Sequence, residues 1–207
     1  MEDVLEVYQR PKDSRRPLVC LDEFAKQLLS ELRPAQLAIC NHVARYDSEY
    51  IREGSATGFI LALPHEGKRD VYFSESGRRT SKDFAHCLEY LANSLPTAEK
   101  IILVMDNLNT HKEASLYEAF PAHKARQLCE RFEIHYTPKH GSWLNMAEME
   151  IGLLVRGCLD RRISSKEEMK EEVEHYLKRR NSKPVPIKWQ FTNKNARIKL
   201  HSIYPSF

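Results

Sequence analysis

The sequence lacks the features of several large protein classes. No stretch approaches the roughly 20 consecutive apolar residues of a membrane helix. The start, Met1–Val4, has neither the basic region nor the apolar core of a signal peptide. The 5 cysteines are widely spaced and never form a C-x-x-C pair, which argues against a disulfide scaffold or a zinc ribbon. We therefore expect a cytoplasmic protein with no membrane partner.

A strong excess of charge is missing too, since the formal net charge is only +3 over 207 residues. Its distribution is uneven, because residues 175–207 contain no Asp or Glu. The basic residues of this stretch are Lys178, Arg179, Arg180, Lys183, Lys188, Lys194, Arg197 and Lys199. Such a stretch could neutralise DNA phosphates. It could also be a solvated basic tail, and a run of charge taken alone favours this second interpretation.

Hydrophobic patterning predicts strands and helices in alternation. The expected strands are 18–21, 59–63, 71–73, 101–105 and 134–136, and the expected helices are 81–95, 111–119, 122–131, 142–159 and 165–177. Residues 24–32 fit either a longer first strand or a short helix, and 46–51 alternate as a further strand would. Residues 181–207 contain three prolines, Pro184, Pro186 and Pro205, and we expect them to be extended.

This element order predicts an α/β protein with an RNase H-like fold, in which a mixed five-stranded sheet is flanked by helices. A basic C-terminal extension would follow it. The first and fourth strands of such a sheet are parallel neighbours, so their carboxyl ends meet. The expected division is a lead over 1–17, an RNase H-like domain over 18–180 and a basic, extended segment over 181–207.

Three carboxylates stand where a metal-dependent nuclease would need them. Asp22 closes the apolar run Leu18–Leu21, Asp106 closes Ile101–Met105, and Glu148 lies early in a predicted helix. Mg²⁺ prefers oxygen ligands and keeps several waters, so a few carboxylates suffice to bind it. The pattern predicts a DDE-type polynucleotidyl transferase, with these three acids as catalytic residues and as ligands of two Mg²⁺ ions, or Mn²⁺ as a substitute.

Each acid also has an ordinary explanation. An Asp after an apolar run is more often a turn residue than a ligand. Glu150 has apolar neighbours much like those of Glu148, so periodicity does not choose between them. Strands that end in Asp also occur in P-loop ATPases and response regulators. The P-loop motif is absent from this sequence, and nothing else suggests a response regulator.

Two phrases around the acids are more specific, namely V-M-D-N-L-N-T-H at 104–111 and H-Y-T-P-K-H-G-S-W-L-N-M-A-E at 135–148. With Y-Q-R-P at 8–11, V-C-L-D-E at 19–23, S-L-Y-E-A-F at 115–120 and A-R-I-K-L at 196–200, they resemble the DDE transposases of bacterial insertion sequences in the mariner superfamily. The resemblance implies Asp22, Asp106 and Glu148 as the catalytic acids, Glu148 being the acid that closes L-N-x-x-E.

The resemblance further implies cleavage and strand transfer of double-stranded DNA, at transposon ends and target, by an enzyme that is a homodimer when active. Members of this family usually carry an N-terminal helix-turn-helix region, and this sequence begins only shortly before the first predicted strand. A separate helix-turn-helix polypeptide is therefore an expected partner. The alternatives are a truncated or domesticated DNA-binding relic, and another RNase H-like nuclease such as a ribonuclease H or a junction resolvase.

Other polar residues near the motifs are candidates for supporting roles. Asn107 and His111 could orient a phosphate or a water molecule, and Lys139 and His140 could contact DNA. The basic C-terminal stretch adds further candidate phosphate contacts, which are Arg179, Arg180, Lys188, Arg197 and Lys199.

Overall fold

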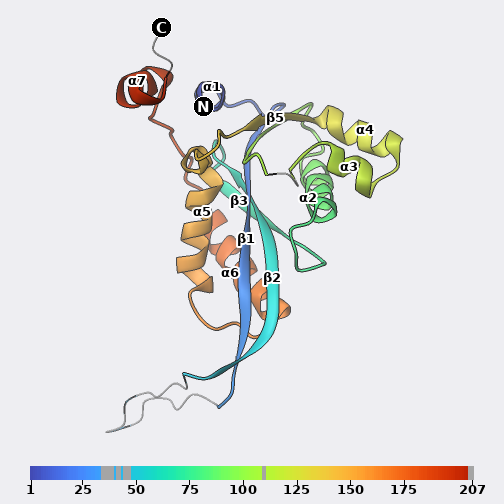
Figure 1. Cartoon of the computed structure of the whole chain (residues 1–207), viewed down its shortest axis with the longest axis vertical. Coiled ribbons are helices and arrows are strands. Elements are labelled where there is room, and N and C mark those ends of the chain that lie inside the picture. Colours follow the sequence, from blue (N-terminus) through green and yellow to red (C-terminus); the bar gives the residue numbers. More distant parts are fainter. Residues whose placement is uncertain (34–39, 41–42, 44–47, 109–110, 205–207) are drawn as a thin grey trace.

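The computed structural model describes residues 1–33, 40, 43, 48–108 and 111–204. The strands in this part of the chain are β1 (Leu18–Glu31), β2 (Tyr50–Leu63), β3 (Lys68–Phe73), β4 (Ile101–Met105) and β5 (Phe132–Tyr136). The helices are α1 (Glu2–Gln9), α2 (Ser81–Ser94), α3 (Ala114–Ala119), α4 (Ala122–Arg131), α5 (Met146–Leu154), α6 (Lys166–Asn181) and α7 (Asn193–Lys199) (Figure 1). Among the described residues, no helix combines the length and apolar character that a membrane crossing requires.

The strands form one mixed sheet in the order β3-β2-β1-β4-β5. β1–β2 and β2–β3 are antiparallel pairs, whereas β1–β4 and β4–β5 are parallel. The predicted five-stranded sheet and the parallel contact of the first and fourth strands are therefore confirmed. The last paired residues of β1 and β4 are Cys20 and Val104. Asp22 and Asp106 each follow two positions later, so the sheet itself brings them to the same place.

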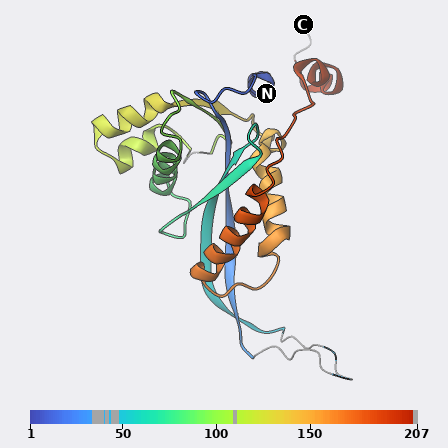
Figure 2. The same ribbon diagram turned by 180° about the vertical axis from the view of Figure 1, so that it is seen from behind.

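Helices cover both faces of the sheet. Alternate residues of a strand point to opposite faces: Leu18 and Cys20 pack in a core with α1, α5 and α6, whereas Val19 and Leu21 pack in a second core with α2, α3 and α4. Figures 1 and 2 show α5 and α6 on one side of the sheet and α2, α3 and α4 on the other. All five residues of β4 are buried, as expected for a strand covered on both faces.

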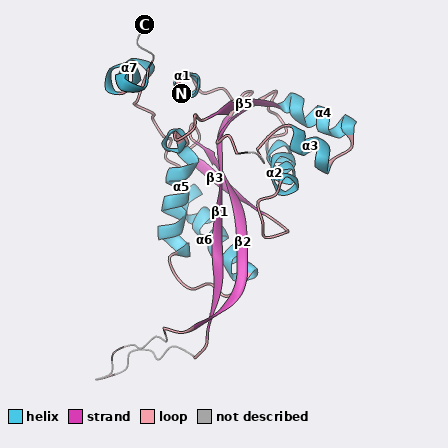
Figure 3. Cartoon of the chain, in the orientation of Figure 1, coloured by secondary structure: helices cyan, strands magenta, loops and turns pink. Residues whose placement is uncertain are grey.

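The first two strands are longer than predicted. Residues 24–31 continue β1 and pair with β2 as far as Tyr50, so the strand alternative for this segment is correct and the helix alternative is wrong. These two strands project beyond the rest of the sheet (Figure 3). Gly58 permits their close packing, because a Cβ there would lie 2.7 Å from the ring of Phe24. Of the further strand expected at 46–51, residues 46–47 lie outside the described residues and β2 begins at Tyr50.

The predicted starts of α2 and α6 are confirmed, because capping residues close by in the sequence determine them. The side chain of Thr80 accepts from the backbone N–H of Asp83, and Asp83 accepts in return from Thr80, which is the expected capping box of α2. Ser165 caps α6 through the N–H of Glu168. His111 was expected to open a helix, but α3 begins only at Ala114.

The predicted helix from Ser142 to about Leu159 is wrong at its start, whereas its end is confirmed. Residues Ser142–Leu144 form a 3-10 turn, and the cap of α5 is Asn145, whose side chain accepts from the N–H of Ala147. After Leu154 the chain continues as a π-helix over Val155–Leu159. Asn145 competes well as a cap because its side-chain oxygen can accept from the free N–H groups of the first turn.

The C-terminal segment is only partly extended, which corrects the prediction for 181–207. Residues 184–191 lack regular secondary structure, but Thr192 and Asn195 form a capping box that starts α7. The irregular part lies against the domain: Ile187 donates its N–H to the carbonyl of Pro64 at 2.9 Å. The ring of Trp189 packs 4.9 Å from that of Tyr8, so this segment contributes to the core that contains α1.

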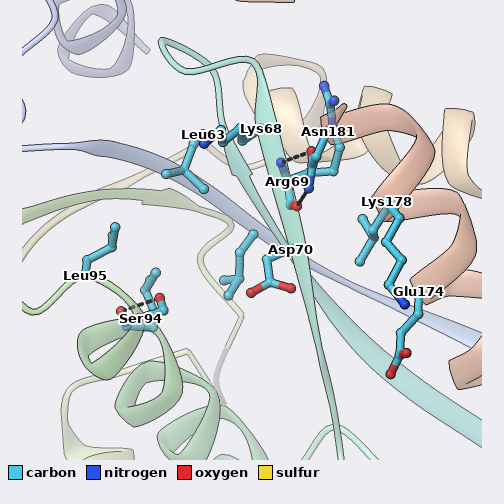
Figure 4. A pocket seen from close by; sticks show the side chains of 12 residues that line it. Leu63, Lys68, Arg69, Asp70, Ser94, Leu95, Glu174, Lys178 and Asn181 are labelled. Carbon is cyan, nitrogen blue, oxygen red and sulfur yellow. Dashed lines mark hydrogen bonds between the residues drawn. The ribbon is translucent and has the colours of Figure 1, made fainter. Parts of the chain in front are cut away.

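The free edge of β3 is covered by a side chain. The amide of Asn181 donates to the carbonyl of Arg69 at 2.7 Å and accepts from its N–H at 3.1 Å (Figure 4). The next outward N–H, that of Val71, donates to the carboxylate of Asp70 at 2.8 Å. A cavity of about 490 Å³ lies beside this edge, among residues of β3, α2 and α6. Its lining does not include Asp22, Asp106 or Glu148.

Candidate active site

Two of the predicted acids lie at the ends of the paired segments of β1 and β4. Asp22 is buried, and its carboxylate accepts from the N–H of Glu23 at 2.9 Å and from the amide of Asn145 at 3.3 Å. Asp106 is half-buried, and its carboxylate contacts Nδ1 of His111 at 2.5 Å. Each acid therefore contacts a polar side chain, from a distant part of the sequence for Asp22 and from the following loop for Asp106.

The third acid arrives on α5, and Asn145 sets where that helix begins. Its buried amide donates to the carbonyl of Leu21 at 2.8 Å as well as to Asp22. The same side chain caps α5, which puts Glu148 in the first helical turn. A negative charge is favoured there by the helix dipole. Glu148 is exposed, and its charge contributes to raising the pKa of Asp22. Asp106 and Glu148 both lie near enough to Asp22 for their charges to raise its pKa.

The structure separates Glu148 from its rival Glu150. The Glu150 carboxylate binds the guanidinium of Arg69 at 2.9 Å, with side chains only 4% and 3% exposed. Arg180 approaches the same carboxylate at 3.9 Å. Glu150 therefore has a structural partner on β3, whereas Glu148 is free to face solvent and the other acids.

Glu23 and His111 join the site, and only His111 was predicted. His111 is 1% exposed, and its Nε2 lies 3.4 Å from the carboxylate of Glu23. Glu23, Asp106 and His111 each offer a ligand atom within 4.8 Å of the others. One local signal points to Glu23, namely that it is a second acid next to Asp22. Strand alternation turns neighbours to opposite faces, however, so local pattern could not place both at one site.

Burial and neighbouring carboxylates shift the pKa values of Asp22 and His111. Burial, followed by the charges of Glu148, Glu23 and Asp106, raises the pKa of Asp22 from 3.8 to about 7, although the N–H of Glu23 acts against this shift. Burial alone would lower the pKa of His111, but its hydrogen bond to Asp106 and the nearby carboxylates raise it above 6.5. The protein without a cation therefore disfavours full ionisation of its acids.

A polar cavity of about 440 Å³ lies beside Asp106. The sequence candidates Asn107, Lys139 and His140 all line it. His140 has a φ of 62°, a left-handed conformation that is uncommon for a residue other than glycine and is found at functional sites. The structure thus brings three of the predicted supporting residues to the edge of the acid cluster.

The C-terminal basic candidates are not part of this cavity. Arg179, Lys188, Arg197 and Lys199 are exposed, and Arg180 is half-buried near Glu150. Arg197 donates two hydrogen bonds to the carboxylate of Glu2, at 2.7 and 2.8 Å. These bonds join α7 to α1. Arg180 and Arg197 therefore have structural partners that DNA would have to share.

The donor set fits a divalent cation of the magnesium type. Hard cations take oxygen ligands, and Asp22, Asp106 and Glu148 supply carboxylate oxygens from two strands and one helix. Burial first, and then the neighbouring carboxylates, raise the pKa of Asp22, and a bound cation would offset the cost of its negative charge. No cysteine takes part among these residues, so the chemistry of the set differs from that of a zinc-thiolate site.

Sequence comparison defines the class of protein. A family model described as DDE superfamily endonuclease matches residues 17–170. The chain belongs to this family. No curated protein sequence matches the chain.

Solved structures of the Mos1 mariner transposase share the fold. The pre-cleavage Mos1 transpososome is similar with a TM-score of 0.51 at 15% identity, the Mos1 strand transfer complex with 0.50 at 16%, and the paired-end complex with Mn with 0.50 at 17%. Each match covers 86% of this chain and 52%, 51% and 52% of the Mos1 chains respectively. The chain therefore spans about half their length. The likeness confirms the RNase H-like fold predicted from the element order.

Proposed function

We propose that this chain is the catalytic domain of a DDE transposase, which cleaves DNA strands and transfers them during transposition of a bacterial insertion sequence of the mariner superfamily. The observation that carries the proposal is the convergence of Asp22, Asp106 and Glu148 from β1, β4 and α5. Membership of the DDE endonuclease family supports it. The structural neighbours support it as well, since they are Mos1 transposase complexes that include a strand transfer complex.

In this proposal Asp22, Asp106 and Glu148 are the catalytic acids and bind two Mg²⁺ ions, or Mn²⁺ in their place. When bound, these ions supply an activated water nucleophile and stabilise the leaving 3′ oxygen. The protein supplies position: Asn145 orients Asp22, and His111 fixes Asp106. The Lys139 ammonium and His140 would bind the DNA backbone beside Asp106, with Asn107 next to them.

The proposal extends to partners and to the rest of the chain. The substrate is double-stranded DNA at transposon ends and target, bound by a cytoplasmic homodimer when active. A helix-turn-helix region would recognise the transposon ends. Residues 18–180 form the catalytic domain, with 1–17 as a lead and 181–207 as a basic segment. Further phosphate contacts are assigned to exposed or half-buried basic residues, namely Arg179, Arg180, Lys188, Arg197 and Lys199.

Nicking of supercoiled plasmid in Mg²⁺ or Mn²⁺ tests this function. The parent should nick, and Asp106→Asn should not, because the variant loses a charged ligand while its amide oxygen can still accept from His111. We expect Asp106→Asn to fold as well as the parent or better, since it relieves repulsion among the acids. Asp70→Asn is the matched control, because Asp70 is a half-buried carboxylate that accepts from Tyr90 outside this site.

The outcomes separate the alternatives. Metal-dependent nicking by the parent and Asp70→Asn, but not by Asp106→Asn, supports the assigned site. Equal nicking by all three would point to another site or a contaminant and contradict it. A folded parent that binds DNA but never nicks would favour a non-catalytic relic. Cleavage of an RNA–DNA hybrid in preference to DNA would favour another RNase H-like nuclease.

A further inference from the structure

We propose that Glu23 and His111 are positioning residues, which together fix the Asp106 carboxylate so that one of its oxygens stays available to a metal ion. The inference rests on the proposed function, because it assigns a role relative to the metal site of that function. It adds Glu23, to which neither the sequence nor the comparisons give a role.

Contacts to both the ring and the backbone of His111 hold this residue in place. Its ring lies 4.7 Å from the ring of Phe84, and its backbone carbonyl accepts from the hydroxyl of Tyr136 at 3.0 Å. The side chain is almost completely buried. With Asp106 on Nδ1 and Glu23 facing Nε2, rotation of the ring would break both contacts. His111 can therefore transmit a fixed direction to Asp106.

The contact between His111 and Asp106 has the length of a hydrogen bond and is too short for two ligands of one ion. Nδ1 and the Asp106 oxygen are 2.5 Å apart. Two neighbouring ligands of an octahedral Mg²⁺, with metal–oxygen bonds near 2.1 Å, would be separated by roughly 2.9 Å. The two atoms are therefore hydrogen-bonded to each other. One oxygen of Asp106 is committed to His111, and the other remains for a cation.

Glu23 completes the arrangement from the other side. Its Oε2 is buried, makes no hydrogen bond within the described residues, and lies 3.4 Å from Nε2 of His111. Glu23 therefore lies against one ring nitrogen of His111 while Asp106 lies against the other. An ionised carboxylate can only accept hydrogen bonds, so each oxygen can hold the ring nitrogen that faces it.

An exposed arginine holds Glu23 in place. Arg79 donates to Oε1 of Glu23 at 2.9 Å, with the Arg79 side chain 65% exposed and that of Glu23 only 7%. The loop before Arg79 is itself fixed. Buried Asp83 accepts from Ser74 at 2.7 Å and from Thr80 at 2.6 Å, at the start of α2. The contacts therefore run continuously from the surface through Glu23 and His111 to Asp106.

Ligands that lack their hydrogen-bonded supports typically bind metal about ten- to a hundred-fold more weakly. Calorimetric measurement of Mn²⁺ binding to the parent, to Glu23→Ala and to Glu23→Gln, without DNA, tests the positioning role. Glu23→Ala should lower the affinity by about that factor without changing the number of ions bound. Glu23→Gln should recover part of the loss, because its amide oxygen can still accept from Nε2. Glu133→Ala is the control, since Glu133 binds Arg10 and does not touch His111.

A second readout does not need metal. The hydrogen-bonded Nδ1 proton of His111 should give a low-field proton NMR signal in the parent. The signal should be absent in His111→Gln, shifted in Glu23→Ala and unchanged in Glu133→Ala. A folded Glu23→Ala with an unshifted signal would overturn the role of Glu23, whatever its effect on cleavage.

The remaining outcomes separate this inference from the proposed function. Parent-like Mn²⁺ affinity in a folded Glu23→Ala would overturn the positioning role, while parent nicking would leave the proposed function standing. Loss of one bound ion in Glu23→Ala would also overturn it, because Glu23 would then be a ligand itself. A folded parent that binds no Mn²⁺ would contradict the metal site of the proposed function, and the inference would fall with it.

Discussion

The amide of Asn145 and the carboxylate of Asp22, 123 residues apart in the sequence, are joined by a hydrogen bond of 3.3 Å. The same amide group donates to the carbonyl of Leu21, and the side-chain oxygen caps α5. One buried side chain therefore links the strand that carries the first acid to the helix that carries Glu148. The distance between these two acids depends on it.

Asn145→Ala should therefore lower both stability and cleavage. The loss of the cap and of the buried partner of Leu21 should lower the free energy of unfolding by roughly 2–4 kcal/mol. Ser165→Ala is the matched control, because Ser165 caps α6 without touching the acids, and it should cost only about 1 kcal/mol. Urea unfolding and plasmid nicking measure the two effects. Nicking by a folded Asn145→Ala at the parent rate would contradict the linking role.

Asp22 should make the stability of the metal-free protein depend on pH. Its folded pKa of about 7 lies above the ordinary 3.8, so the folded state favours the protonated form. The unfolding free energy should therefore fall as pH rises from about 4 to 7, by an amount on the order of a few kcal/mol, at about 1.4 kcal/mol per pKa unit. His111, with its raised pKa, acts in the same direction.

The comparison with Asp22→Asn isolates this contribution. Urea unfolding in a chelator between pH 4.5 and 8 should show the variant gaining on the parent as pH rises. Added Mg²⁺ should stabilise the parent more at pH 8 than at pH 5 and should have little effect on Asp22→Asn. A difference between the two proteins that stays constant with pH would refute the assignment.

Glu148 and Glu150 should respond oppositely to substitution. Glu148→Ala should stay within about 0.5 kcal/mol of the parent stability and lose cleavage, because the residue is exposed. Glu150→Ala should cost about 3–5 kcal/mol, because it leaves Arg69 buried without its carboxylate partner. Thermal unfolding and nicking distinguish the two. Loss of cleavage in a stable Glu150→Ala would reverse the assignment.

Lys139→Ala should weaken binding to all DNA sequences about equally. Removal of one phosphate contact should reduce the slope of log affinity against log salt by about 1. Lys100→Ala is the control, because this exposed lysine precedes β4 at the opposite end of that strand. Arg179→Ala applies the same test to the basic C-terminal stretch. A loss confined to one DNA sequence would contradict a backbone contact.

Local sequence signals predicted much of the fold. The β1–β4 pairing follows from the order of elements, and the α2 capping box of Thr80 and Asp83 depends only on neighbouring residues. The start of α5 was missed because Ser142 and Asn145 are both good caps, and the contact that favours Asn145 is with Leu21 on a distant strand. The capping box of Thr192 and Asn195 that starts α7 is also a local signal, but the prolines of this segment favour an extended chain.

The composition of the site was less predictable than its position. Strand ends and motif spacing brought Asp22, Asp106 and Glu148 forward as candidates. The choice between Glu148 and Glu150 depends on Arg69, which binds Glu150 from β3. The helical spacing of apolar residues around the two acids does not reveal this contact. The role of Glu23 depends on contacts with His111 and Arg79 from two separate loops, which no local pattern encodes.

The side chain of Asn181 has a consequence for association between chains. An edge strand normally offers its N–H and carbonyl groups to any extended peptide that approaches. At β3 the amide of Asn181 occupies both groups of Arg69, and Asp70 occupies the N–H of Val71. A foreign strand would have to displace the end of α6 before it could pair there. The part of the β3 edge at Arg69 and Val71 is thus closed to strand addition unless the end of α6 moves away.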